Sequence, residues 1–173
     1  MIRRFILTGA PGAGKTTILR ELAARGHAVV EEAAHPVIAE MTAGGFAEPW
    51  LDPSFTDRIC RRQADLRAAA TAPQQFHDRS PVCTLALARY LPQPVSPTLA
   101  AEAAIAPDLY ERRVFLVQPL GFIVNTEARR ISYADTLKFE AVHIAAYEEL
   151  GFVLIPIPPG TVEERADIIE AHI

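Results

Sequence analysis

Short apolar runs alternate along this chain with longer stretches in which apolar residues recur every three or four positions. A short apolar run suits a strand that is buried on both faces, whereas the longer spacing suits a helix with one buried face. Their alternation predicts strand–helix units, and therefore an α/β fold with a parallel sheet. The predicted strands cover residues 5–8, 28–30, 74–77, 114–117 and 152–155.

The longer stretches supply the helices, and some of them begin at capping residues. Ser80 followed by Pro81 starts a helix that runs to Leu91, because Ser can cap free N–H groups and Pro needs no hydrogen bond there. Thr161, with Glu164 three residues later, makes a capping box for the last helix. The other predicted helices cover residues 15–25, 36–41, 54–70, 98–106 and 134–150.

Two of these elements are less regular than the others. The strand at 74–77 is polar for a strand buried on both faces, and its position between two helices is the reason to place it there. In the helix over 134–150, aliphatic residues at helical spacing predict the buried face. This face comprises Leu137, Ala141, Ile144 and Ala145.

The segment from Gly9 to Thr16 matches the pattern G-x-x-x-x-G-K-[ST] directly after the first strand and at the start of the first helix. Glycines let backbone N–H groups converge on a phosphate, and the helix N-terminus adds partial positive charge. A glycine-rich turn without a ligand is the alternative, and the strand–helix context disfavours it. The residues expected to bind the phosphates of ATP are Gly9, Ala10, Pro11, Gly12, Ala13, Gly14, Lys15, Thr16 and Thr17.

Two side chains of this phosphate cradle, residues 9–17, have distinct expected roles. The ammonium of Lys15 neutralises the β- and γ-phosphate oxygens, and the hydroxyl of Thr16 supplies a hard oxygen ligand to Mg²⁺. The predicted cofactor is therefore Mg²⁺, with ATP as the substrate. GTP stays open, although the chain lacks the Asn-Lys-x-Asp pattern of guanine recognition.

Carboxylates follow two of the predicted strands. Glu31 and Glu32 come after the strand at 28–30, and Asp78 comes after the strand at 74–77. These strand ends face the ligand in a doubly wound sheet, so we expect Glu32 to accept the proton of an attacking hydroxyl and Asp78 to hold Mg²⁺ through its water shell. The alternatives are acids that only favour the next helix N-terminus, or a simple turn residue.

Arginines near the predicted site are candidate partners of the transferred phosphoryl group. Arg79 can bind a phosphate through its bidentate fork. Arg129 lies in an irregular stretch, and a lid over residues 119–135 could bring its charge onto the phosphoryl group. A solvated surface is the alternative for Arg129 and its neighbour Arg130.

The composition narrows the range of partners. With 173 residues, half of them hydrophobic, the chain is expected to form one domain over residues 1–173. A net charge of −4 argues against nucleic acid or an anionic membrane as the main partner. The first apolar run is too short for a signal peptide and no stretch is long enough to span a membrane, so we expect a soluble, cytoplasmic protein with two reduced cysteines.

Four segments together resemble a known family. They are GAPGAGKTT at 9–17, VVEEAAH at 29–35, DRS at 78–80 and the closing AYEELGFVLIPIPPGTVEERADII. In combination they resemble the stand-alone AAA-labelled P-loop domains, often called predicted ATPases. That group is similar to the nicotinamide riboside kinase domain and, more distantly, to nucleoside and thymidylate kinases. The resemblance implies a three-layer P-loop NTPase fold, in which helices cover both faces of a five-stranded parallel sheet of order 2-3-1-4-5.

The resemblance also implies site residues. Glu32 occupies the position of the family's catalytic carboxylate, and the Asp78-Arg79 pair matches the family pattern. The chain departs from that pattern at two positions. His35 replaces the Arg of a Glu-x-x-Arg stretch, and Thr126 replaces the acid of a lid Asp-x-x-Arg that ends at Arg129.

Two functions remain open. The first is a small-molecule kinase that transfers the γ-phosphate of ATP to a nucleoside-like hydroxyl acceptor, bound between the end of the strand at 28–30 and the helix portion 55–66. The second is a regulatory ATP- or GTP-binding protein with slow NTP hydrolysis. A remodelling AAA motor is disfavoured, because the chain is too short for the additional helical domain. The sequence identifies neither the acceptor nor the oligomeric state.

Overall fold

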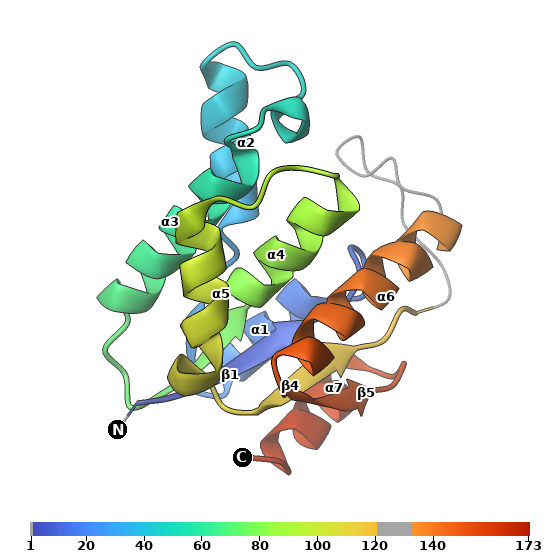
Figure 1. Ribbon diagram of the computed structural model, residues 1–173. Helices are drawn as coiled ribbons and strands as arrows, with labels where there is room; N and C mark the ends of the chain where they lie inside the picture. Colours follow the sequence, from blue (N-terminus) through green and yellow to red (C-terminus); the bar gives the residue numbers. More distant parts are fainter. Residues whose placement is uncertain (1, 121–132) are drawn as a thin grey trace.

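One parallel sheet forms the centre of the protein (Figure 1). The computed structural model describes residues 2–120 and 133–173, and its five strands lie in the order β2-β3-β1-β4-β5. They are β1 (Arg3–Thr8), β2 (Ala28–Val30), β3 (Gln74–Asp78), β4 (Arg113–Val117) and β5 (Val153–Ile157). The α/β class and the strand order are therefore confirmed, and β5 extends beyond its predicted end.

Helices cover both faces of this sheet and complete three layers (Figure 1). On one face α1 packs against α7; on the other, α4 packs against α5 and α6, and α3 packs against α4 and α5. The helices are α1 (Lys15–Ala24), α2 (Ala34–Ala43), α3 (Phe55–Ala69), α4 (Pro81–Tyr90), α5 (Pro97–Leu109), α6 (Tyr133–Glu149) and α7 (Val162–Glu170), with a 3₁₀ turn η1 (Pro49–Leu51). In Figure 1, α2 and η1 project beyond the layered body.

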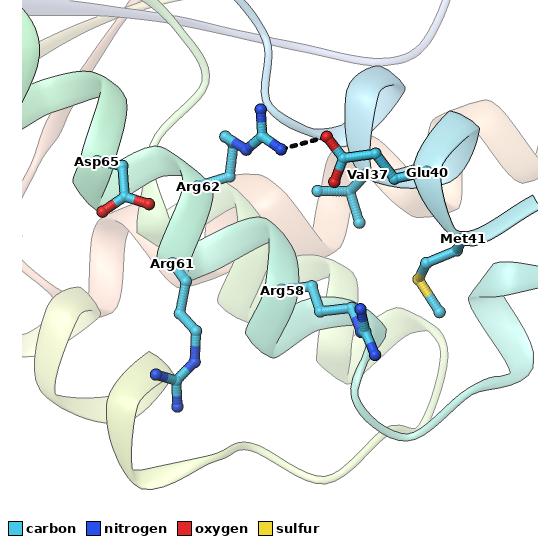
Figure 2. Close-up of a pocket in the computed structure, with 7 residues that line it drawn as sticks. All are labelled: Val37, Glu40, Met41, Arg58, Arg61, Arg62 and Asp65. Atoms are coloured by element: carbon cyan, nitrogen blue, oxygen red, sulfur yellow. Dashed lines mark hydrogen bonds and ion pairs between the residues drawn. The ribbon is translucent and has the colours of Figure 1, made fainter. Parts of the chain in front are cut away.

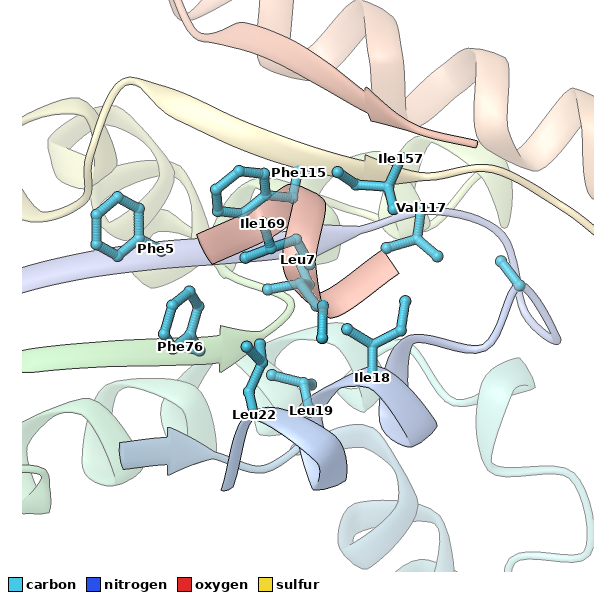
Figure 3. Close-up of a cluster of buried hydrophobic side chains, with 12 residues drawn as sticks. Phe5, Leu7, Ile18, Leu19, Leu22, Phe76, Phe115, Val117, Ile157 and Ile169 are labelled. Carbon is cyan, nitrogen blue, oxygen red and sulfur yellow. The ribbon is translucent and has the colours of Figure 1, made fainter. Parts of the chain in front are cut away.

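Alternation along β1 fills the core on both sides of the sheet. Phe5 and Leu7 pack with Ile18 of α1 in a cluster that also includes residues of α7 (Figure 3). Ile6, which points to the opposite face, belongs to a second cluster with Tyr147 of α6. All of these side chains are fully buried. The strand that leads into the phosphate cradle is therefore anchored from both sides.

The polar strand β3 is a central strand, paired with both β1 and β2. Its buried Gln75 donates two hydrogen bonds, to the carbonyls of Ala70 at 2.9 Å and Ala72 at 2.8 Å. The Oε1 atom of Gln75 lies 3.0 Å from Nε2 of His77. Burial, together with two nearby arginines, lowers the pKa of His77 to about 3, so the ring is neutral. Internal hydrogen bonds replace water here, which explains how a polar segment occupies the sheet centre.

The buried face of α6 differs from the predicted one. Leu137 is 44% exposed, Ala141 and Ala145 are also exposed, and Ile144 is only half-buried. The buried positions are Thr136, Phe139, His143, Ala146 and Tyr147. The prediction followed aliphatic residues, whereas α6 buries aromatic and polar side chains that find partners on α4. The hydroxyl of Tyr147, for example, lies 3.0 Å from Cys83 Sγ.

The two predicted helix starts have different outcomes. Thr161 Oγ1 accepts from the N–H of Glu164 at 3.2 Å, and Glu164 Oε2 accepts from the N–H of Thr161 at 2.9 Å, so the capping box is confirmed. Ser80 lies at the N-cap position of α4, but its hydroxyl makes no cap hydrogen bond. It bonds to the hydroxyl of Tyr147 at 2.8 Å instead and thereby joins α4 to α6.

Candidate nucleotide-binding site

The phosphate cradle begins where β1 ends and continues into α1. Gly9, Gly12 and Gly14 have φ angles of 136°, 81° and 94°, which favour glycine. A Cβ atom on Gly9 would lie 2.4 Å from the carbonyl oxygen of Val117, at the end of β4. Close contact between the loop and β4 therefore requires glycine at this position. The loop ends at the N-terminus of α1, where an anion is favoured.

Lys15 is the first residue of α1, and its side chain folds back onto the cradle. Its ammonium donates to the carbonyl oxygens of Gly9 at 3.0 Å and Ala10 at 2.9 Å. Burial, reinforced by the charge of Arg79 and opposed by that of Asp78, lowers the pKa of Lys15 to about 7. A phosphate in the cradle would favour the charged form of this buried amine.

Thr16 and Asp78 meet across the start of α1 and the end of β3. The Thr16 hydroxyl donates to Oδ2 of Asp78 over 3.3 Å. Asp78 is 5% exposed, and within the described part of the chain its Oδ1 atom is buried without a hydrogen-bond partner. Burial raises the pKa of Asp78, and the charge of Lys15 acts against this rise. A hydroxyl beside an unpartnered carboxylate oxygen fits the hard oxygen donors that Mg²⁺ prefers.

Glu32, just after β2, is bound by two partners. Its Oε1 atom accepts from Arg79 Nε at 3.0 Å, and its Oε2 atom lies 2.5 Å from Nδ1 of His35. Burial acts to raise the pKa of Glu32, but the His35 hydrogen bond and the Arg79 charge together lower it to about 2. Glu31 is exposed to solvent. Of these two acids, Glu32 is therefore the one that interacts with other charged side chains at the carboxyl ends of the strands.

Arg79 adopts a left-handed backbone conformation, with φ of 74°, which is unusual for a residue other than glycine. Its guanidinium lies over the ring of Phe139 of α6, 5.7 Å from the ring centroid. The charge of Arg79 acts on Lys15, Glu32 and Asp78. These four predicted site residues therefore form one interacting cluster at the carboxyl ends of β1, β2 and β3.

The remaining predicted site residues have different placements. Ala10 and Ala13 are buried, Pro11 is half-buried, and Thr17 is exposed on the first turn of α1. Arg129 and most of the predicted lid at 119–135 lie outside the described residues.

Two contacts with the cradle were not predicted from the sequence. Arg165 of α7 is 2% exposed and donates to the carbonyl oxygen of Ala13 at 2.8 Å. Glu140 of α6 lies near the cradle: burial raises its pKa, and the backbone of Ala10 and the charge of Lys15 act against this rise. A signal for Arg165 was available, because it lies among the buried positions of α7, where an apolar residue is expected. Nothing in the local sequence distinguishes Glu140 from the other polar residues of α6.

An open pocket of about 200 Å³ lies between α2 and α3 (Figure 2). It is lined by Val37, Glu40, Met41, Arg58, Arg61, Arg62 and Asp65. Two of its arginines are engaged in ion pairs, Arg62 with Glu40 and Arg61 with Asp57. Among the described residues, only α2 and α3 line this pocket, and none of its lining residues belongs to the cradle.

Residues 2–120 and 133–173 contain no group of three or more His, Cys, Asp or Glu that could hold a metal ion. No helix among the same residues has both the length and the apolar character needed to cross a membrane.

Solved structures with the same fold include two of NadR protein. The complex of NadR with NR has a TM-score of 0.71 and 16% identity, and the match covers 99% of this chain and 50% of that chain. The complex of NadR with NAD and AMP-PNP has a TM-score of 0.63 and 17% identity, with coverages of 99% and 48%. The present chain thus spans about half the length of these NadR chains.

A third similar structure is shikimate kinase from Acinetobacter baumannii in complex with shikimate. Its TM-score is 0.60 at 14% identity, over 99% of this chain and 93% of that chain. At these identities the similarity establishes a P-loop kinase-like fold. A comparison with curated proteins gives no match. A family model described as an AAA domain matches residues 4–165, nearly the whole chain, and the chain therefore belongs to this AAA domain family of P-loop proteins.

Proposed function

We propose that this chain is one domain, residues 1–173, that acts as an Mg²⁺-dependent phosphotransferase from ATP to a hydroxyl of a small, nucleoside-like acceptor. The main support is the buried Oδ1 of Asp78 beside the Thr16 hydroxyl, an oxygen that has no hydrogen-bond partner among residues 2–120 and 133–173. Binding of a simple phosphate would not require this costly carboxylate, whereas chemistry on an Mg-bound triphosphate does.

In this proposal the cradle residues 9–17 bind the phosphates, and Lys15 neutralises their β and γ oxygens. Thr16 would hold Mg²⁺ through its hydroxyl, and Asp78 would hold it through water. The bound ion supplies positive charge to the triphosphate. Arg79 and Arg129 are assigned to the transferred phosphoryl group, where guanidinium charge stabilises the transition state.

The transfer step needs a base beside the acceptor. The acceptor oxygen forms a bond to the γ-phosphorus, the bond from this phosphorus to the bridging oxygen of ADP breaks, and the hydroxyl proton passes to Glu32. With a pKa of about 2, Glu32 is a weak base while Arg79 and His35 hold it. Acceptor binding must therefore displace at least one of these partners before Glu32 can act.

A regulatory ATP- or GTP-binding protein with slow hydrolysis is the second candidate. The ion pair between Glu32 and Arg79 favours it, because a carboxylate held in this way does not readily take a proton. In that case the same cradle binds the nucleotide, and Glu32 and Arg79 serve only to connect the ends of β2 and β3.

A screen of acceptors tests the proposed reaction. The acceptor class is inferred from the two similar folds, since NadR was observed with NR and shikimate kinase with shikimate, both small molecules. Wild-type protein is incubated with Mg-ATP and separate nucleosides, other ribosides and hydroxy acids, and the products are analysed by mass. The proposal predicts one acceptor class that gains a single phosphate while ADP forms. Production of ADP and inorganic phosphate alone, with every acceptor, would support the slow hydrolase instead.

A further inference from the structure

We propose that Arg165 is a positioning residue of the phosphate cradle, and that its guanidinium also supplies positive charge to the bound phosphates from behind the loop. This inference rests on the nucleotide-binding part of the proposed function. Arg165 lies near the start of α7, far from the glycine-rich segment in sequence, and it belongs to no pattern that marks the cradle.

Two hydrogen bonds connect Arg165 to the cradle and to the end of β4. Nη1 donates to the carbonyl oxygen of Ala13 in the cradle, and Nη2 donates to that of Gln118 just after β4, both at 2.8 Å. A Cβ atom on Gly14 would lie 3.1 Å from Nη1, so the loop backbone passes directly over the guanidinium. Arg165 thus joins α7, the cradle and the end of β4.

The contact with Ala13 sets the direction of the next amide. In a planar trans peptide, the carbonyl of one residue and the N–H of the next point in opposite directions. Because Arg165 binds the carbonyl of Ala13, the N–H of Gly14 must point away from α7, toward the other side of the loop. One N–H at the N-terminus of α1 is thereby oriented before any phosphate binds, which reduces the ordering that binding requires.

The charge of Arg165 is unusual for a buried arginine. Only 2% of the residue is exposed, and its Nε atom has no hydrogen-bond partner among the described residues. In the same residues no carboxylate pairs with it, and burial alone lowers its pKa. Glu164, its neighbour in sequence, is committed to the capping box with Thr161. A buried cation without an acid is costly, and the phosphates of a nucleotide would provide the missing negative charge.

The competing explanation is that Arg165 only attaches α7 to the rest of the protein. Arg25 provides a matched control, because it also connects α7 to the rest of the protein. Its Nη1 atom bonds to Asp167 and Glu170 of α7, both at 2.6 Å, and it makes no contact with the cradle in the described structure. If Arg165 only attached α7, the Arg165 and Arg25 variants would behave alike. For the same loss of melting temperature, both would lose the same amount of nucleotide affinity.

The test compares wild type, Arg165→Met, Arg165→Lys and Arg25→Met by calorimetric titration with Mg-ATP at low and high salt, with a thermal melt of each. Arg165→Met should lose at least about tenfold in affinity and show a weaker salt dependence, because a positive charge behind the loop is removed together with the hydrogen bond that orients it. Arg165→Lys should recover part of the loss. Arg25→Met should lower the melting temperature but keep affinity within about twofold of wild type.

The proposal is overturned if Arg165→Met binds Mg-ATP within about twofold of wild type, or if Arg25→Met loses as much affinity as Arg165→Met. Should Arg165→Met fail to fold, Arg165→Lys and Arg165→Gln replace it in the test, since only Lys keeps the charge. Equal Mg-ATP affinities of these two variants would overturn the charge role. Wild-type protein that bound no Mg-ATP would refute the proposed function as well. Binding without phosphate transfer would refute only the kinase assignment and leave the Arg165 comparison valid.

Discussion

Lys15 links nucleotide binding to pH through a single buried amine. Its pKa is lowered from 10.5 to about 7, first by burial and then by Arg79. A bound phosphate raises that pKa, so binding and protonation favour each other. Mg-ATP affinity should therefore be constant below pH 7 and fall as the pH rises above it, by up to about tenfold per unit. Calorimetry between pH 6 and 9 measures this, and an affinity that stays level across the range would contradict the placement of Lys15.

Glu32 distinguishes the two candidate functions. Glu32→Gln cannot accept a proton, so under the kinase proposal it should lose at least ~10²-fold in acceptor phosphorylation. Mg-ATP affinity should change little, since Glu32 binds Arg79 and His35 rather than the cradle. The melting temperature should fall, because the partly buried Arg79 loses its charged partner.

The exposed neighbour Glu31 provides the control for that experiment. Glu31→Gln should keep both activity and melting temperature. Full phosphate transfer by Glu32→Gln would show that the base lies elsewhere. In that case the acids after β2 would have only the structural role of connecting strand ends.

At the scale of elements, the site depends on the alignment of β1 with β3. Leu7 pairs with Asp78 across the two strands, which brings the Asp78 carboxylate to the start of α1. Asp78→Asn should weaken Mg-ATP binding more than it weakens binding of ATP in EDTA, because an amide is a poorer partner for hydrated Mg²⁺. Titrations in the two conditions measure the difference. Asp65→Asn, which changes an exposed acid of α3, is the control. If Asp78→Asn lost the same affinity with Mg²⁺ and with EDTA, Asp78 would be a structural residue.

The elements also differ in how far the sequence predicts them. The strands and the cradle were predicted because each depends on a contiguous pattern: buried apolar runs, and glycines at fixed spacing before a helix. The buried face of α6 was not predicted, because Tyr147 is buried through contacts of its hydroxyl with Ser80 and Cys83 at another helix. Local periodicity contains no information about such partners.

Contacts between site residues that are far apart in the chain could not be predicted from the sequence, for the same reason. Glu32 was predicted as the base that accepts the acceptor proton, and its pairing with Arg79, which lies 47 residues away, was not predicted. Arg165 reaches Ala13 over a separation of 152 residues. The positions of these residues after the predicted strands indicated which of them gather at the carboxyl ends of the strands. The pairing among them, which sets their pKa values, depends on the folded arrangement.

At the scale of the whole molecule, three basic side chains gather at the cradle of an acidic protein. The formal net charge is −4, yet Lys15, Arg79 and Arg165 gather around the cradle from three different elements. The general field does not attract anions, so specific binding must come from this local arrangement. The shared kinase-like fold explains the arrangement of elements, and the charge cluster is the feature that the proposed function depends on.

The central claim is that this cradle binds the phosphates of Mg-ATP, and a calorimetric titration of wild type and Lys15→Met tests it most directly. Wild type should bind one Mg-ATP per chain. At pH 6.5, Lys15→Met should bind at least about tenfold more weakly, because a charge-assisted contact is lost. Lys138→Met, which changes an exposed lysine of α6, should bind like wild type. Binding by Lys15→Met within about twofold of wild type, in a protein that melts normally, would contradict the claim.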